Sequence, residues 1–350
     1  MAQRVLMKGN EAIAEGAIRA GCDAYFGYPI TPQTELLEYM SANMPANGRV
    51  FVQAESEVAA INMVYGAAAS GKRAMTSSSS PGISLKQEGI SYLAGAELPA
   101  VIVNVMRGGP GLGNIAAAQA DYFQATKGGG HGGYHPLVLA PASVQEAMDL
   151  TALAFDLADK YRNPVMVLTD GVIAQSMEPV ELRHYQRLEV EKAYVVDGCA
   201  GRAKRKVSSA ELVPERLEKH DQALARKYET MVATEQRWAG SLLEGAKVVL
   251  VAYGTVGRVA QTTARLARAE GLAVGLLRPV TLFPFPSDKL DSLAGTTAAF
   301  LVSEMSQGQM VEDVRLIVNG RAPVHFYGRQ GGIVPTPQEL LERVKAIYPA

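Results

Sequence analysis

Only two of the 350 residues are cysteines, Cys22 and Cys199, and they lie far apart in the sequence. Two isolated thiols of this kind supply neither a disulfide framework nor a metal site. They also cannot ligate an iron–sulfur cluster, which takes about four thiolates. Any such cluster that this protein works with must therefore be carried by another chain.

Charge of one sign and long apolar runs are missing as well. The formal net charge is −1, which gives no reason to expect a nucleic-acid or an anionic-membrane partner. No run of about 18 apolar residues occurs, and the first residues lack the pattern of a signal peptide. Aromatic residues make up only 7%, against 48% apolar residues, as in an Ala/Val/Gly-rich α/β enzyme. We expect a soluble, cytoplasmic protein.

Helix and strand patterns alternate along two parts of the chain, and 350 residues are enough for about two domains. The first part covers residues 1–180 and the second covers 246–350. Both predict an α/β fold with a doubly wound, mostly parallel sheet. The residues between them, 181–245, are dense in charge and predict a connecting segment with a helix from about Glu215 to Leu243.

Residues 50–82 combine a strand, an acidic turn, a helix and a second strand. The short apolar strand Val50–Gln53 is followed by a small-residue helix that starts at Glu57. Because ligands collect at the carboxyl ends of parallel strands, Glu57 is placed to protonate or polarise a heterocyclic nitrogen. The alternative is that Glu55 and Glu57 only complement the helix dipole, which is worth roughly 0.3–1 kcal/mol each.

Two further strand ends carry candidate ligand-binding groups. After the strand 23–27, the turn Tyr28-Pro29-Ile30-Thr31-Pro32 presents the Thr31 hydroxyl, which either faces the ligand crevice or caps the helix 32–44. The apolar strand 99–106 ends at Arg107, before a glycine-rich turn. A cation beside glycines suits a carboxylate or a phosphate, although a solvated loop arginine is the alternative.

Residues 127–136 form another glycine-rich segment, with two histidines. It lacks the pattern of a phosphate-binding P-loop, and two histidines without a carboxylate or cysteine set are weak evidence for a metal. We therefore predict no metal site. The segment is interpreted as a loop over the active site, with a plain surface loop as the alternative.

The chain resembles the 2-oxoacid:ferredoxin oxidoreductase family of thiamine-diphosphate enzymes. The resemblance rests on the Tyr28–Pro32 motif and on the helix from Glu57 through Tyr65-Gly66-Ala67. It implies a pyrimidine-binding domain followed by a transketolase C-terminal-like domain. It further implies that Glu57 binds the aminopyrimidine N1′ of thiamine diphosphate, that Arg107 pairs with the 2-oxoacid carboxylate, and that Thr31 hydrogen-bonds the substrate. Tyr28, Pro29 and Ile30 would line the cofactor.

The resemblance also implies partner subunits. Relatives hold magnesium and the cofactor diphosphate with a Gly-Asp-Gly motif, and the nearest string here is Thr169-Asp170-Gly171. A thiamine-diphosphate/Mg²⁺-binding subunit, a gamma-type subunit and a ferredoxin-like iron–sulfur subunit are therefore expected. The implied reaction is the coenzyme A-dependent oxidative decarboxylation of a 2-oxoacid to an acyl-CoA, with CO₂ release and with ferredoxin as electron acceptor.

The implied substrate is a branched-chain 2-oxoacid. The strings at 7–12 and 108–114 look most like the large subunit of 3-methyl-2-oxobutanoate:ferredoxin oxidoreductases. A 2-oxoglutarate:ferredoxin oxidoreductase subunit is the runner-up. A non-oxidative thiamine-diphosphate lyase or transferase and a non-catalytic scaffold are further alternatives.

Overall fold

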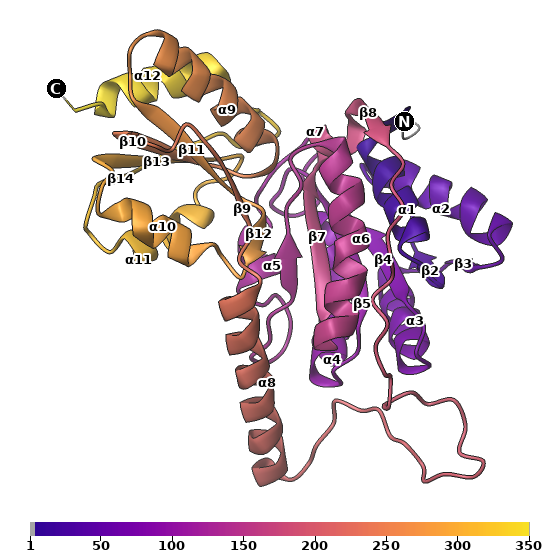
Figure 1. The fold of residues 1–350 in the computed structure, drawn as a ribbon. Coiled ribbons are helices and arrows are strands. Elements are labelled where there is room, and N and C mark those ends of the chain that lie inside the picture. Colours follow the sequence, from indigo (N-terminus) through magenta and orange to yellow (C-terminus); the bar gives the residue numbers. More distant parts are fainter. Residues whose placement is uncertain (1–3, 350) are drawn as a thin grey trace.

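The larger of two main sheets has seven strands, and six of them run parallel to one another. The computed structural model describes residues 4–349 (Figure 1). Only the edge strand β12 is antiparallel to its neighbour, β6. In spatial order the strands are β12 (Thr281–Phe283), β6 (Leu137–Leu139), β7 (Pro164–Asp170), β5 (Ala100–Met106), β4 (Ala74–Ser78), β2 (Ala24–Gly27) and β3 (Val50–Gln53).

Seven helices of the described chain accompany these strands. They are α1 (Gly9–Arg19), α2 (Thr34–Ala46), α3 (Glu57–Ala69), α4 (Ser80–Gly95), α5 (Tyr122–Thr126), α6 (Val144–Tyr161) and α7 (Gly171–Gln175). Five of them, α2 to α6, connect consecutive strands of the sheet, as expected for parallel strands that need crossover connections, whereas α1 precedes β2 and α7 follows β7. Side-chain caps fix three starts: Ser56 Oγ accepts from Ala59 N in α3, Ser143 Oγ accepts from Glu146 N in α6, and Asp170 Oδ1 accepts from Val172 N and Ile173 N in α7.

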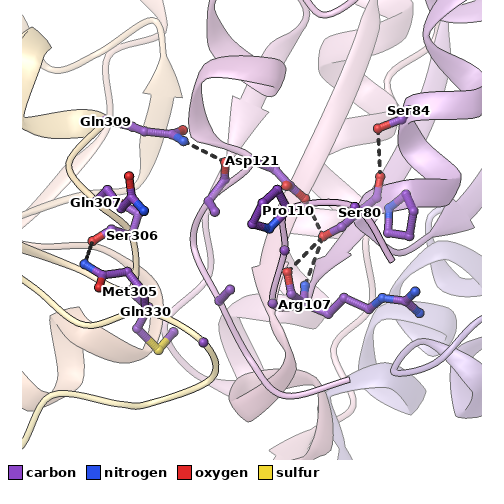
Figure 2. Close-up of a pocket in the computed structure, with 17 residues that line it drawn as sticks. Ser80, Ser84, Arg107, Pro110, Asp121, Met305, Ser306, Gln307, Gln309 and Gln330 are labelled. Carbon is purple, nitrogen blue, oxygen red and sulfur yellow. Dashed lines mark hydrogen bonds between the residues drawn. The ribbon is translucent and has the colours of Figure 1, made fainter. Parts of the chain in front are cut away.

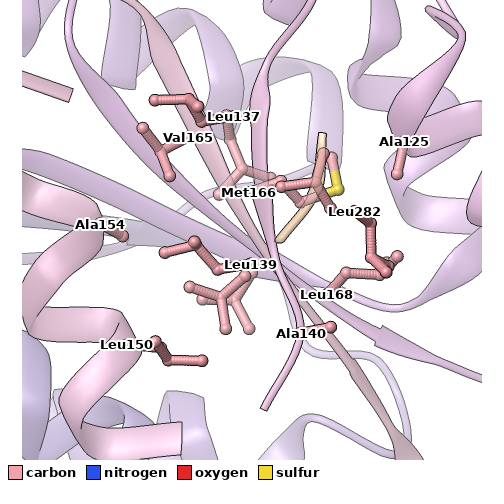
Figure 3. Close-up of a cluster of buried hydrophobic side chains, with 14 of the residues drawn as sticks. Ala125, Leu137, Leu139, Ala140, Leu150, Ala154, Val165, Met166, Leu168 and Leu282 are labelled. Atoms are coloured by element: carbon pink, nitrogen blue, oxygen red, sulfur yellow. The ribbon is translucent and has the colours of Figure 1, made fainter. Parts of the chain in front are cut away.

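The core of this sheet is apolar on both faces. Every residue of β5 and β7 is buried, as in a parallel sheet covered by helices on both sides. Figure 3 shows how Leu137, Leu139 and Leu168 of the sheet meet Leu150 of α6 and Leu282 of β12. Because this packing holds the strands rigidly, the loops at their ends keep a fixed spacing.

The second main sheet has five strands, and three of its four strand pairs are parallel. Its order is β14 (Val324–Gly328), β13 (Ala299–Glu304), β10 (Val248–Val251), β11 (Val274–Pro279) and β9 (Trp238–Ser241). Its helices are α9 (Gly254–Ala269), α10 (Ser287–Ala294), α11 (Met310–Val318) and α12 (Pro337–Ile347). The α/β fold class with two mostly parallel sheets is thereby confirmed.

The connecting segment differs from its prediction. Its helix, α8 (Pro214–Thr234), ends well before Leu243, and residues 238–241 instead form β9, antiparallel to β11. The chain leaves the helix at Glu235, a buried carboxylate that accepts hydrogen bonds from Lys160 Nζ (2.7 Å) and Tyr161 OH (2.6 Å) of α6. These bonds fix the end of α8 against the helices that cover the first sheet. Because the partners lie far away in sequence, no local sequence pattern predicts this helix end.

Two pairings join distant parts of the sequence. β1 (Arg4–Lys8) pairs with β8 (Met177–Glu181) in a separate two-stranded sheet near the two ends of the expected first domain. β12, from the expected second domain, joins the first sheet by pairing with β6. Before α8, residues 182–213 form an irregular strap along the first sheet's helices (Figure 1). The boundaries at 180 and 246 stay a prediction. Within residues 4–349, no helix combines the length and apolar composition that crossing a membrane requires.

Candidate active site

The residues singled out in the sequence follow neighbouring strands at one edge of the seven-stranded sheet. The segment 28–31 follows β2, Glu57 follows β3 and starts α3, and Arg107 follows β5. β4, which lies between β2 and β5, leads into Ser79 and Ser80. Since these strands are parallel, their carboxyl ends meet at the same edge. The structure therefore brings the predicted residues to one region.

Arg107 joins two of these loops. Its Nη1 donates to the Thr31 carbonyl oxygen (2.9 Å) and its Nη2 donates to the Leu112 carbonyl oxygen (3.1 Å). The side chain is buried, and its Nε has no hydrogen-bond partner in the described chain. Both partners are neutral, so the guanidinium charge remains available to an anionic ligand. Arg107 is therefore not the solvated loop residue of the alternative interpretation.

Thr31 does not cap the following helix. The N-cap of α2 is Gln33, two residues later, and the Thr31 residue is exposed. Gln33 is buried and fastens the turn: its Nε2 donates to the Tyr28 carbonyl (3.2 Å), and its Oε1 accepts from Ser77 Oγ (2.5 Å) of β4. The turn is thus fixed by a side chain that the sequence did not indicate. The Thr31 hydroxyl forms no hydrogen bond with another described residue and can serve another role.

A cavity of about 620 Å³ opens between Arg107 and the second sheet. Its walls come from the glycine turn 108–111, the start of α4, residues 305–309 and residues 330–331. Figure 2 shows Ser80 and Asp121 pointing toward one another there, with Gln307 and Gln309 on the opposite wall. Arg107 is the only lysine, arginine or histidine in the lining formed by the described residues.

Asp121 is the acidic group of this cavity. Its Oδ2 accepts from Ser80 Oγ (2.6 Å) and from Asn104 Nδ2 (2.9 Å). Burial raises the pKa of Asp121, and these two hydrogen bonds act in the opposite direction by stabilising the carboxylate. Ser80 Oγ also accepts from the Arg107 main-chain N–H (3.0 Å). Ser80 therefore links the start of α4 to the end of β5. Its position in a run of serines does not by itself predict this contact.

Glu57 is buried at the start of α3, 6% exposed, against the first turn of α4. A β-carbon at Gly82 would lie only 2.7 Å from Glu57 Oε1, so the glycine makes room for the carboxylate. In residues 4–349 that carboxylate has no hydrogen-bond or ion-pair partner. Nearby, the hydroxyls of Ser78 and Ser79 are buried and have no hydrogen-bond partner in the described part of the chain. Buried polar groups are normally paired, which indicates a ligand here.

Asp170 belongs to the string Thr169-Asp170-Gly171, which is the closest in this sequence to the Gly-Asp-Gly motif. Its carboxylate is hydrogen-bonded to groups of this same chain. Its Oδ1 accepts from the N–H groups of Val172 and Ile173 at the start of α7 (both 3.2 Å). Thr255, at the start of α9, donates to it from both its hydroxyl and its main-chain nitrogen. Among the described residues, no group of three or more His, Cys, Asp or Glu side chains is arranged to hold a metal ion.

The glycine-rich loop 127–136 lies outside the lining of this cavity, and its interpretation as a loop over the active site stays a prediction. The loop lies on α4, where Tyr134 OH donates to Gln87 Oε1 (3.1 Å). His135 stacks on Phe283 with 4.4 Å between ring centroids, and burial lowers its pKa. His135 thus serves the packing of β12 against the first sheet.

Comparisons with known proteins agree over nearly the whole chain. Residues 15–237 match the thiamine-diphosphate-binding domain of pyruvate flavodoxin/ferredoxin oxidoreductases, and residues 246–340 match core domain II of pyruvate:ferredoxin oxidoreductase. The ketoisovalerate oxidoreductase subunit VorB of Methanothermobacter thermautotrophicus is 53% identical, over 98% of this chain and 97% of that one. The 2-oxoglutarate synthase subunit KorA of Archaeoglobus fulgidus is 38% identical, over 97% and 98%.

A solved structure supports the fold. The 2-oxoglutarate:ferredoxin oxidoreductase from Magnetococcus marinus, with 2-oxoglutarate, coenzyme A and succinyl-CoA bound, is similar with a TM-score of 0.89 and 29% identity. The match covers 99% of the present chain but only 65% of the other one. The chain therefore spans about two thirds of the length of that relative.

Proposed function

The chain belongs to the pyruvate flavodoxin/ferredoxin oxidoreductase family, and on that premise we propose that it is a subunit of a branched-chain 2-oxoacid:ferredoxin oxidoreductase. The complex would convert a 2-oxoacid such as 3-methyl-2-oxobutanoate and coenzyme A into an acyl-CoA and CO₂, and reduce ferredoxin. The observation that carries the proposal is Glu57, a buried residue that follows β3 and starts α3 and whose carboxylate has no hydrogen-bond partner within residues 4–349.

The described residues fit one half of thiamine diphosphate. Glu57, with the unpartnered hydroxyls of Ser78 and Ser79, suits the nitrogen atoms of an aminopyrimidine ring. The diphosphate and its Mg²⁺ require a separate ligand set, and the oxygens of Asp170 are already occupied by α7 and α9. We infer that a partner subunit holds that half, and that Tyr28, Pro29 and Ile30 border the cofactor.

Each residue of the site has a distinct task. When bound, thiamine diphosphate supplies the carbanion chemistry of decarboxylation. Glu57 would share a proton with the ring N1′ and accept a hydrogen bond from that nitrogen when it is protonated. Arg107, held by two carbonyls, pairs with the carboxylate of the 2-oxoacid. Thr31, whose hydroxyl forms no hydrogen bond with another described residue, donates a hydrogen bond to the substrate close to the reacting carbon.

Two observations favour a branched-chain substrate over 2-oxoglutarate. Identity to the ketoisovalerate subunit, 53%, exceeds the 38% to the 2-oxoglutarate subunit over similar coverage. The cavity also offers one cation, Arg107, and an acidic Asp121. One cation matches one carboxylate, whereas 2-oxoglutarate carries two. A branched aliphatic side chain needs no second cation.

The electron path lies outside this chain. Cys22 is buried and Cys199 is exposed, and both are free. The iron–sulfur clusters that pass electrons to ferredoxin therefore belong to a ferredoxin-like subunit. A thiamine-diphosphate/Mg²⁺-binding subunit and a gamma-type subunit complete the proposed complex.

The test is to purify the chain with its co-expressed partners and assay a panel of 2-oxoacids with an artificial electron acceptor. We expect kcat/KM for 3-methyl-2-oxobutanoate to exceed that for 2-oxoglutarate, and turnover to require coenzyme A. The opposite preference would support the 2-oxoglutarate enzyme. Turnover without coenzyme A or an acceptor would support a non-oxidative lyase or transferase. A lone, thiamine-free chain without activity would refute the proposal.

A further inference from the structure

Lys86 is a fully buried lysine in α4. Its Nζ donates to Thr76 Oγ1 of β4 at 3.0 Å. Lysine is almost never fully buried unless it is paired, and a hydroxyl does not balance the charge of an ammonium group. No carboxylate among residues 4–349 forms a direct ion pair with Lys86. The feature that compensates for the burial must therefore act over a longer distance.

The packing of α4 on α3 identifies that feature. Gly82, Lys86 and Gly89 are spaced by four and three residues, so they lie on one face of α4. At both glycines a β-carbon would clash with α3: with Glu57 at Gly82 and with Ile61 at Gly89. Lys86 is thus on the face that contacts α3, one turn from the glycine that touches the Glu57 carboxylate.

The strand beneath gives the same placement. Thr76 and Ser78 are two residues apart on β4, so their side chains share one face of the sheet. Thr76 accepts the hydrogen bond from Lys86, and Ser78 lies against Gly82 beside Glu57. Ammonium and carboxylate therefore occupy the same layer between α3, α4 and β4.

We propose that Lys86 is a positioning residue whose buried ammonium group holds the Glu57 carboxylate directed toward the pyrimidine ring of the cofactor. The proposal rests on the proposed function, because it assigns Glu57 to that ring. Lys86 itself does not touch the cofactor. It balances a negative charge that would otherwise be buried alone when the ring covers Glu57.

Charge and protonation agree with this assignment. Burial lowers the pKa of Lys86 to about 8, while the negative charge of Glu57 acts in the opposite direction. Glu57 on α3 is the only charged group in the described part of the chain that affects the protonation of Lys86; β4 contributes the neutral Thr76. Lys86 is therefore largely protonated at neutral pH and loses its charge just above it.

The test is a double-mutant cycle on the assembled complex, with the dissociation constant of thiamine diphosphate measured by calorimetry without substrate. Lys86→Met keeps most of the length of the side chain, being one atom shorter, and removes its charge. We expect it to weaken cofactor binding about tenfold when Glu57 is present and to have little effect beside Glu57→Gln, because interacting residues are not additive. Thr76→Val is the matched control: it removes the hydrogen bond but keeps the charge, and should change binding less.

A second measurement needs no substitution. Between pH 7 and 9.5, affinity of the natural complex for thiamine diphosphate should fall as Lys86 loses its proton, and affinity of the Lys86→Met complex should lack this fall. A flat profile of the natural complex, or a Lys86→Met effect that is equal in both Glu57 backgrounds, would overturn the role of Lys86 alone. If Glu57→Gln changes neither cofactor affinity nor turnover, the proposed function fails as well.

Discussion

Asp170 accepts two hydrogen bonds from Thr255, one from its hydroxyl (2.5 Å) and one from its main-chain nitrogen (2.9 Å). Asp170 ends β7 of the first sheet, and Thr255 lies in the first turn of α9, which belongs to the second. Gln119 adds to this contact by donating to the Tyr253 carbonyl (2.9 Å). The two sheets are thus joined beside the cavity whose walls they share.

We predict that Asp170→Ala strongly destabilises the chain. The substitution removes the cap of α7 and leaves Thr255 without its buried partner, at a cost of about 2–4 kcal/mol of unfolding free energy. Urea denaturation followed by circular dichroism measures this loss. Asp291→Ala is the control, because Asp291 pairs with Arg321 on the surface and should cost less than about 1 kcal/mol. Equal losses would contradict the role of Asp170.

We predict that Arg107→Ala impairs use of the 2-oxoacid more than assembly. A charge-assisted contact to a carboxylate is worth about 1.5–3 kcal/mol, so kcat/KM should fall about ten- to a hundredfold or more. Steady-state kinetics and gel filtration of the complex measure the two effects. Arg107→Lys retains charge but not the fork that binds Thr31 and Leu112, and should recover only part of the activity. Normal turnover of an intact Arg107→Ala complex would refute the assignment.

A pH series of unfolding tests the burial of Lys86. Its pKa is lowered from 10.5 to about 8 in the folded chain, so between these values the unfolded chain binds more protons. Stability contributed by this group therefore rises with pH across that window, by on the order of 3 kcal/mol in total. In urea denaturation at pH 7.5, 8.5 and 9.5, the natural chain should gain stability relative to Lys86→Met. A constant difference would mean that Lys86 titrates normally.

Local patterns were sufficient for the elements that present the site. The helix start at Glu57 and the apolar strand ending at Arg107 both depend on neighbours within a few residues, and the structure has each of them. These predictions are reliable because the types of neighbouring residues determine where a helix starts and where a buried strand lies.

The features that the sequence did not indicate depend on distant partners. The Thr31 cap was wrong because Gln33, tied to β4, sets the start of α2 instead. The sequence around Lys86 and Asp121 does not predict that they are buried. A lysine or an aspartate is normally expected at the surface, and only the fold places these two against another strand or helix. These groups surround the candidate site, so its chemistry was harder to predict than its position.

The last prediction concerns Glu57→Gln in the assembled complex. The substitution keeps the shape and most of the packing, and it removes the carboxylate that stabilises the protonated ring nitrogen. General acid–base contributions are about 10²–10⁴-fold, so turnover should fall by at least two orders of magnitude with little change in melting temperature. Glu55→Gln is the control, since Glu55 is exposed whereas Glu57 is buried against Gly82. If Glu57 served only the helix dipole, turnover would be unchanged and stability would drop by less than about 1 kcal/mol. Loss of turnover in Glu55→Gln with an active Glu57→Gln would move the assignment to Glu55.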